Sequence, residues 1–270
     1  MIRADFHVHT RYCDGRDTPE EMIRAALRKD FQVLGFSGHS FTAFDLSCCM
    51  SREATLRYRA ELAALREKYR GKLEILMGIE QDYYATDPAE GYDYIIGSVH
   101  YLETGGQYLT LDNTAAELAE GIDRCFGGDP YRLAGAYYQT VAQVVEQTRA
   151  DIIGHFDLIT RFQEEVPLFD PMHPRYREAS EEAVRRLIPY GVPFEVNTGA
   201  MARGYRTAPY PSERLLRLIR ELGGEVILTS DCHDRRCLGY AFDQAAALLK
   251  KCGFTRAVTR TQAGFAFDPL

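Results

Sequence analysis

Residues 3–10 read RADFHVHT, a short run in which apolar and β-branched residues surround two histidines. Such a composition is typical of a strand, and we predict one near residues 3–9. Successive side chains of a strand point to opposite faces, so His7 and His9, two positions apart, point to the same side. The two imidazoles can therefore chelate one metal ion.

Further apolar runs predict strands, and longer amphipathic segments lie between them. These strands lie near residues 33–38, 74–79, 93–99, 151–155, 193–197 and 225–230. The predicted helices begin at the capping sequence Thr18-Pro19-Glu20-Glu21 and then cover about residues 51–69, 114–125, 131–149, 174–189, 212–222 and 240–251. Alternating strands and helices indicate an α/β fold around a parallel sheet.

The organisation of the chain favours one domain. No Pro-, Gly- or Ser-rich linker, low-complexity tract or short repeat divides it, so we expect residues 1–270 to form a single unit. Two segments carry weaker patterns. Phe41–Met50 and Thr104–Gly135 look like loops or short helices that could cover a site.

Charge and cysteine usage exclude several classes of protein. A net charge of −7 and a pI near 5.6 argue against a nucleic-acid partner, which requires clustered Lys and Arg. Seven cysteines without a CxxC pair fit neither a disulfide framework nor a zinc ribbon. The first residues lack a signal-peptide pattern, and no apolar run approaches the ~20 residues that span a bilayer. We expect a cytoplasmic protein with no membrane partner.

Six of the seven histidines lie at or just after the end of a predicted strand. They are His7, His9, His39, His100, His155 and His233. In a barrel of parallel strands the carboxyl ends share one face, where these side chains would converge. Glu80 ends the third predicted strand, and Asp231 follows the last. One such histidine is more often structural than a ligand, but six with two acids predict a metal centre of the zinc, iron or manganese type.

Seven motifs in order along the chain carry a family resemblance. They are HVHT (7–10), GFSGHS (35–40), GIEQDY (78–83), GSVHYL (97–102), GHFDLITRF (154–162), FEVNTGAMARG (194–204) and SDCH (230–233). The set resembles the polymerase-and-histidinol-phosphatase (PHP) superfamily, specifically its stand-alone histidinol-phosphatase branch. The resemblance implies a distorted (β/α)7 TIM-like barrel that holds two or three ions of zinc, iron or manganese.

The resemblance also assigns the ligands. It implies a first ion bound by His7, His9, Glu80 and Asp231, and a second bound by Glu80, His100 and His155. It implies a third ion bound by His39 and His233. Where the family often has a further histidine after the first motif, this chain reads TRYCDG, and Asp14 is the candidate replacement.

The implied activity is hydrolysis of a small phosphorylated substrate, foremost L-histidinol phosphate in histidine biosynthesis. Metal ions lower the pKa of bound water, so we expect a metal-bridging hydroxide to attack phosphorus. Arg161 and Arg203 resemble the family's phosphate-binding positions, and a guanidinium matches phosphate oxygens. Asp231 and His233 are candidates for protonating the leaving oxygen.

Alternative activities and weaker site residues stay open at this point. The protein could act on another small phosphomonoester or a nucleotide, or be an inactive structural or interaction module; a zinc amidohydrolase would need a bridging lysine that no strand-end motif supplies. We interpret His173 as structural and leave Asp5 open as a possible support for an imidazole. Tyr83, Tyr84 and Tyr101 could line the pocket, whereas Arg235 and Arg236 are weaker phosphate-binding candidates.

Overall fold

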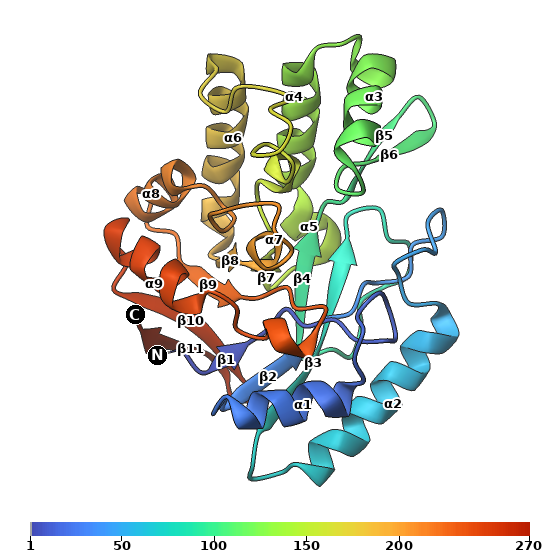
Figure 1. Cartoon of the computed structure of the whole chain (residues 1–270), viewed down its shortest axis with the longest axis vertical. Helices are drawn as coiled ribbons and strands as arrows, with labels where there is room; N and C mark the ends of the chain where they lie inside the picture. The colour runs from blue at the N-terminus through green and yellow to red at the C-terminus, as the bar shows by residue number, and fades with distance from the viewer. Residues whose placement is uncertain (1) are drawn as a thin grey trace.

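The computed structural model describes residues 2–270 and shows a curled sheet surrounded by helices (Figure 1). The strand order in the sheet is β1-β2-β3-β4-β7-β8-β9-β10-β11, and each strand from β1 to β9 pairs in parallel with the next. These parallel strands are β1 Ala4–Asp5, β2 Val33–Phe36, β3 Glu74–Asp82, β4 Tyr94–Ser98, β7 Ile152–Ile153, β8 Phe194–Asn197 and β9 Val226–Thr229. They match the seven predicted strands, although β1 and β7 are shorter than predicted.

A single parallel bridge between Val8 and Cys232 joins the two ends of this strand series. The amide of His9 donates to the carbonyl oxygen of Cys232, and the amide of Cys232 donates to the carbonyl oxygen of His7, both at 2.9 Å. The residues that follow β1 and β9 therefore lie side by side. This contact brings the HVHT and SDCH motifs together, as a distorted seven-stranded barrel requires.

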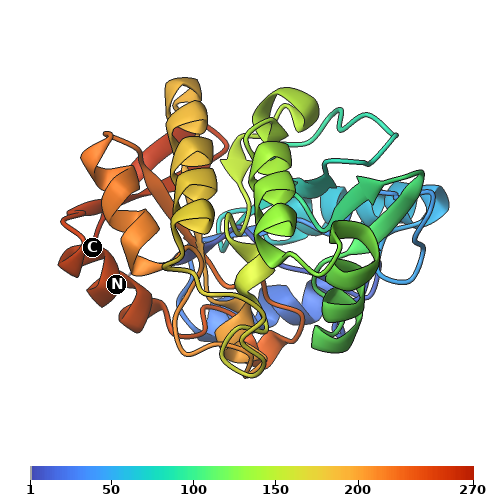
Figure 2. The ribbon, with the colours of Figure 1, turned by 90° about the horizontal axis from the view of Figure 1, so that it is seen from above.

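Helices pack around the sheet at the predicted positions. Their bounds are α1 Pro19–Arg28, α2 Arg52–Lys68, α3 Ala115–Phe126, α4 Pro130–Val141, α5 Val144–Thr148, α6 Pro174–Leu187, α7 Gly199–Ala202, α8 Glu213–Glu221 and α9 Phe242–Lys251, with short 3₁₀ turns at Leu158–Thr160, Ile188–Tyr190 and Arg235–Cys237. The predicted capping box is confirmed, since Thr18 accepts from the Glu21 amide and the Glu21 carboxylate accepts from the Thr18 amide. Helices α4 and α6 pack side by side (Figure 2).

Three features differ from the sequence-based expectation. The helix predicted over 131–149 is divided into α4 and α5, and the segment from 104 onward begins within a hairpin of β5 Tyr101–Thr104 and β6 Gln107–Thr110. Gly105 and Gly106 form its tip with positive φ angles, as a two-residue turn requires. The hairpin of β10 Arg256–Thr261 and β11 Gly264–Pro269 was not predicted; most side chains of β11 are exposed or half-buried, so no apolar run marks it.

The concave side of the sheet is apolar at the amino-terminal ends of the strands and polar at their carboxyl ends. At its amino-terminal end, apolar side chains from β1, β2, β3, β4, β7 and β9 form a small separate cluster. The Tyr94 ring fills part of this space, because a Cβ on Gly35 or Gly78 would lie within 2.4 Å of it. In β3, Leu76 belongs to the cluster and Glu80 lies four residues on, so both point to the same face. The apolar filling thus ends where the polar site begins.

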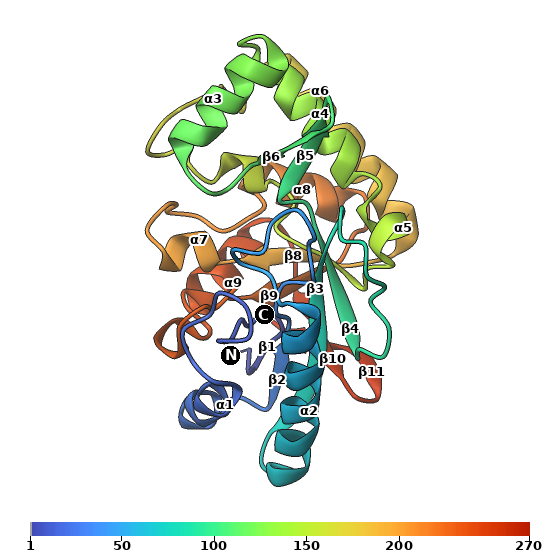
Figure 3. The same cartoon turned by 90° about the vertical axis from the view of Figure 1, so that its right-hand side faces the viewer.

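Helices α3, α4 and α6 gather at the end of the molecule opposite α1 and α2, with the β5–β6 hairpin beside them (Figure 3). Among the described helices, none has both the length and the apolar character needed to cross a membrane.

Candidate metal centre

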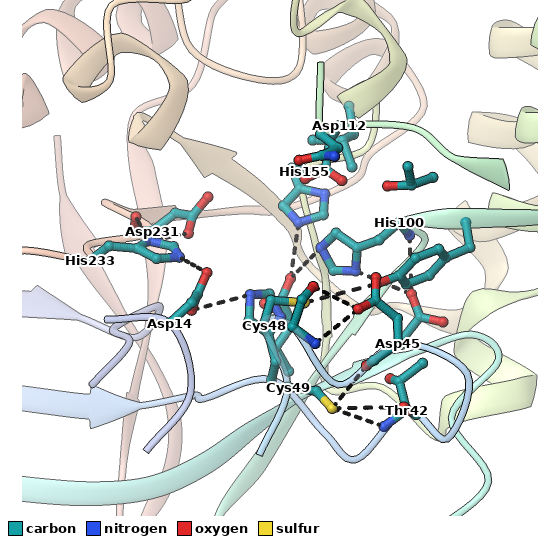
Figure 4. A pocket seen from close by; sticks show the side chains of 18 of the residues that line it. Asp14, Thr42, Asp45, Cys48, Cys49, His100, Asp112, His155, Asp231 and His233 are labelled. Carbon is teal, nitrogen blue, oxygen red and sulfur yellow. Dashed lines mark hydrogen bonds and ion pairs between the residues drawn. The ribbon is translucent and has the colours of Figure 1, made fainter. Parts of the chain in front are cut away.

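The nine predicted metal ligands lie together at the carboxyl ends of the parallel strands. Figure 4 shows Asp14, His100, His155, Asp231 and His233 among them. Seven of them line a cavity of about 470 Å³, while His7 and His9 are fully buried beneath it. The seven are Asp14, His39, Glu80, His100, His155, Asp231 and His233. Strand ends that are up to 226 residues apart in sequence therefore build one polar site, as His7 and His233 illustrate.

Glu80 lies at the centre of the cluster, with its two carboxylate oxygens facing different imidazoles. Oε2 lies 3.1 Å from His7 Nε2 and 2.9 Å from His39 Nδ1. Oε1 lies 2.9 Å from His155 Nε2 and 3.3 Å from His100 Nε2. A carboxylate that presents each oxygen to a separate group of ligands has the arrangement needed to bridge two ions.

A further group of potential ligands lies beside this centre. Asp14 Oδ2 is 3.1 Å from His233 Nε2, and Asp14 Oδ1 is 3.7 Å from His39 Nε2. His9 joins this group as well as the Glu80 group. Asp14, the candidate replacement for the histidine of the family motif, thus lies within one group with His9, His39 and His233.

Asp231 connects the cluster to an arginine. Its Oδ1 lies 3.3 Å from His9 Nε2, and its Oδ2 accepts from Arg203 Nη2 at 2.9 Å. The backbone of Asp231 has a φ of 46°, a left-handed conformation that is rare outside glycine and is often found where function constrains the chain. Gly199 permits this position, because a Cβ there would come within 2.7 Å of the Asp231 side chain.

Two buried carboxylates that were not predicted hold the imidazoles in place. Glu195, fully buried in β8, contacts His7 Nδ1 at 2.5 Å and accepts from the His155 amide at 2.7 Å. Asp82 lies 3.1 Å from His100 Nδ1. Such contacts fix the ring orientation and leave the opposite ring nitrogen free for a metal. An acid within the apolar run FEVN was the available sequence signal for Glu195, since a buried carboxylate needs partners.

Asp5 supports the backbone of the site and makes no contact with an imidazole ring. Its carboxylate accepts from the Ser230 amide at 3.0 Å, from the Gly239 amide at 3.2 Å and from the Ser230 hydroxyl. Burial raises the pKa of Asp5 to about 6, despite these hydrogen bonds. The role left open from sequence is therefore to hold the turn that precedes Asp231.

The charges of the cluster follow from burial and from close neighbours. Burial disfavours the charged form of His7, but the carboxylates of Glu195 and Glu80 outweigh it and raise the pKa of His7 well above its usual range. Burial, together with the nearby His233, lowers the pKa of His9 to about 3. Burial would raise the pKa of Glu80, yet the surrounding imidazoles hold it well below its usual range. The acids are ionised and require positive charge nearby, from protons or from metal ions.

The donor atoms of the cluster fit a metal ion. Among the described residues, His7 Nε2, His9 Nε2 and Glu80 Oε2 are buried and have no hydrogen-bond partner. Buried polar atoms without a partner are costly, and here the two nitrogens lie 3.1 and 3.5 Å from the same oxygen. Lone pairs directed into one shared space are what a bound cation would satisfy.

Arg161 and Arg203 both line the cavity, as the sequence predicted. Arg161 donates to Asp112 at 2.9 Å and lies over the Tyr205 ring at 4.6 Å, while Arg203 also contacts His233 Nδ1 at 3.0 Å. The Nε atom of each arginine is buried without a hydrogen-bond partner in residues 2–270. Both guanidinium groups are thus held close to the cluster by acids.

Most of the weaker candidates lie outside the cavity. Arg235 pairs with Asp17 and Arg236 with Asp234, and neither lines the cavity. His173 caps α6 by accepting from the Arg175 amide at 3.2 Å, in agreement with its structural interpretation. Of the three tyrosines considered from sequence, Tyr101 lines the cavity, and Tyr83 and Tyr84 do not.

The loop of residues 41–50 and the β5–β6 hairpin, together called the mouth here, form the outer wall of the cavity. Phe44 of the loop stacks on Tyr108 of the hairpin, with ring centroids 3.6 Å apart. Tyr101 in the hairpin donates to Asp45 in the loop at 2.9 Å. The 41–50 loop and the hairpin, which overlaps the open segment 104–135 at residues 104–110, therefore contact each other at the cavity wall.

Comparison with known proteins gives one family. Residues 5–199 match the PHP domain family. The "Probable histidinol-phosphatase" of Deinococcus radiodurans is 30% identical over 261 residues, which cover 93% of this chain and 94% of the relative. The histidinol-phosphatase of Bacillus subtilis is 27% identical over 275 residues, which cover 93% of this chain and 100% of the relative.

A solved structure shows the same fold. The histidinol phosphate phosphatase from Lactococcus lactis, complexed with zinc, L-histidinol and phosphate, superposes with a TM-score of 0.74 over 98% of each chain at 21% sequence identity. The predicted TIM-like α/β fold is thereby confirmed.

Proposed function

Because the chain belongs to the PHP domain family, we propose that it is a metal-dependent phosphomonoester hydrolase that acts on L-histidinol phosphate. The observation that carries this proposal is the gathering of six histidines with Glu80, Asp231 and Asp14 at a cavity that Arg161 and Arg203 also line. Relatives of nearly the same length that are named histidinol-phosphatases support the choice of substrate.

The ligand assignment follows the groups in the structure. His7, His9, Glu80 and Asp231 would hold a first ion, and Glu80, His100 and His155 a second. Asp14, His39 and His233 would hold a third. Two or three ions bound in this way would supply a nucleophilic hydroxide near neutral pH and neutralise charge on the phosphoryl group. Zinc in the Lactococcus lactis relative supports zinc here, with iron and manganese as alternatives for this donor set.

The arginines and the acids behind the imidazoles have separate tasks in this proposal. Arg161 and Arg203 bind the phosphate, because a planar guanidinium donates two parallel hydrogen bonds to phosphate oxygens. Glu195 and Asp82 keep the rings of His7 and His100 in the orientation that ligation needs. Asp231 and His233, the two residues predicted to act on the leaving oxygen, lie next to Arg203. His233 is our candidate for delivering the proton to the leaving alkoxide, whereas Asp231 is ionised and can only accept a proton or pass one on.

Two further expectations belong to the same proposal. Site residues come from position 7 to position 233, which supports one catalytic domain over residues 1–270. All seven cysteines are free, which supports a reducing, cytoplasmic location.

The release of inorganic phosphate tests the proposal. Purified enzyme loaded with zinc, iron or manganese is assayed on L-histidinol phosphate and, in parallel, on glycerol phosphate, p-nitrophenyl phosphate and a nucleoside monophosphate. We expect kcat/KM to be highest for L-histidinol phosphate. Preference for another ester would reassign the substrate, and absence of turnover on every ester with metal bound would point to an inactive module.

A further inference from the structure

One acid of the cavity wall differs from all the others. Six carboxylates line the cavity, and five of them lie within 3.1 Å of an imidazole or guanidinium nitrogen. These five pairs are Asp14 with His233, Glu80 with His39, Asp82 with His100, Asp112 with Arg161, and Asp231 with Arg203. Asp45 is the sixth, and among residues 2–270 no basic side chain forms an ion pair with it.

Asp45 is nevertheless firmly placed. Its Oδ1 accepts from the Ser47 amide at 2.9 Å and from the Ser47 hydroxyl at 2.6 Å, and its Oδ2 accepts from Tyr101 at 2.9 Å. Burial would raise the pKa of this half-buried acid, but the hydrogen bonds from Ser47 and Tyr101 outweigh it and lower the pKa. The mouth thus presents a fixed, ionised carboxylate whose donors are all neutral groups.

Asp45 lies away from the side of the cavity where Arg203 pairs with Asp231. It lies on the His100 side of the cavity, away from Asp231 and His233 (Figure 4). It is also absent from the groups of side chains, among the described residues, that could hold a metal ion. The acid therefore belongs to the part of the cavity left for the alcohol portion of an ester, once the phosphate lies between the cluster and the arginines.

We infer that Asp45 binds a cationic group on the leaving alcohol, and that the enzyme thereby selects phosphate esters of amino alcohols over neutral phosphomonoesters. The inference rests on the proposed phosphatase function. A phosphate ester that carries an ammonium has charges of opposite sign at its two ends, and the cavity presents arginines to one and Asp45 to the other. In a partly enclosed cavity such a charge pair adds more to affinity than at an open surface. Tyr101 acts as a positioning residue, because it holds the carboxylate and does not carry the charge.

A matched pair of esters tests this inference. O-phosphoethanolamine carries an ammonium where 2-hydroxyethyl phosphate carries a hydroxyl, so the two differ mainly in charge. We expect the wild-type enzyme to have the higher kcat/KM for O-phosphoethanolamine. Asp45→Asn keeps an oxygen for Ser47 and places its amide NH2 against the Tyr101 hydroxyl, which can accept, but it removes the charge. It should lower that preference by roughly tenfold or more, mainly through KM, since a hydrogen bond to a charged group contributes about that factor.

Two control variants separate charge from structure. Glu120→Gln removes one negative charge at an exposed position of α3 and should leave the ratio of the two kcat/KM values unchanged. Tyr101→Phe removes one donor to Asp45 and should lower the ratio less than Asp45→Asn does. An equal loss on both esters in Asp45→Asn, or an unchanged ratio, would overturn the inference.

The two proposals fail in different ways. Fast hydrolysis of L-histidinol phosphate together with an unaltered ratio in Asp45→Asn would refute the role of Asp45 and leave the proposed function standing. Conversely, a ratio that depends on Asp45 without turnover of L-histidinol phosphate would support the role of Asp45 and assign another amino alcohol as the leaving group.

Discussion

The floor of the cavity and its mouth are built in contrasting ways. On the floor, His7, His9 and Glu80 are at most 1% exposed, and carboxylates behind the rings fix their orientation. The mouth is held by contacts of Phe44 with Tyr108 and Tyr101 and by a few hydrogen bonds, and its Phe44 and Tyr108 remain 38% and 42% exposed. A buried, cross-linked floor suits chemistry that tolerates little displacement, whereas an open mouth can vary with the leaving group. The predictions below test this division.

The largest effect is expected for Glu80→Ala, which removes the carboxylate shared by the imidazoles. Activity should fall by about a thousandfold or more, because metal ions contribute several kcal/mol to catalysis, and bound metal measured by mass spectrometry should fall with it. The fold should persist in circular dichroism. Glu120→Gln is the matched control, and wild-type turnover in Glu80→Ala would contradict the role of the floor.

Glu195→Gln should have the next largest effect. The amide no longer supplies the charge that orients the His7 ring, so metal affinity, measured by titration against a chelator, should fall by about 10- to 100-fold. Because Glu195 acts through His7, excess metal should restore part of the activity. If excess metal restored nothing while the bound ions were retained, Glu195 would have a role other than positioning.

Smaller effects are expected for Arg161→Ala and Arg203→Ala, which leave the floor in place. Each should raise KM for the phosphate ester by about 10- to 100-fold, as expected for loss of a charge-assisted hydrogen bond. Metal content should stay unchanged in Arg161→Ala. Arg203 also holds Asp231, so its loss should lower kcat as well. An unchanged KM in both variants would remove the arginines from the phosphate site.

The smallest effect should follow Phe44→Ala at the mouth. Loss of the stack on Tyr108 should lower kcat/KM only about twofold to fivefold, because exposed aromatic pairs contribute about 1 kcal/mol, and it should leave metal binding intact. A loss as large as that of Glu195→Gln, or a loss of metal, would show that mouth and floor are not separable.

The contrast between floor and mouth also explains which site residues could be predicted from the sequence and which could not. Strand ends follow from apolar runs, and histidines at those ends converge once the strands are parallel, so the meeting of the six histidines with Glu80 and Asp231 was predicted. Glu195 was missed because an acid inside the apolar run FEVN indicates a buried carboxylate but does not identify its partners, which lie on other strands. Asp45 was missed because its carboxylate is positioned by Tyr101, which is 56 residues away in a hairpin with no strong strand pattern.

The central claim is that remote imidazoles and acids converge on Glu80 to hold metal ions beside a phosphate site. A crystal structure with phosphate, recorded with anomalous scattering at the absorption edges of zinc, iron and manganese, tests it most directly. We predict at least two anomalous peaks bonded to Glu80 and its surrounding histidines, with phosphate between them and Arg161 or Arg203. The same side chains without any bound ion in metal-supplemented crystals would contradict the account.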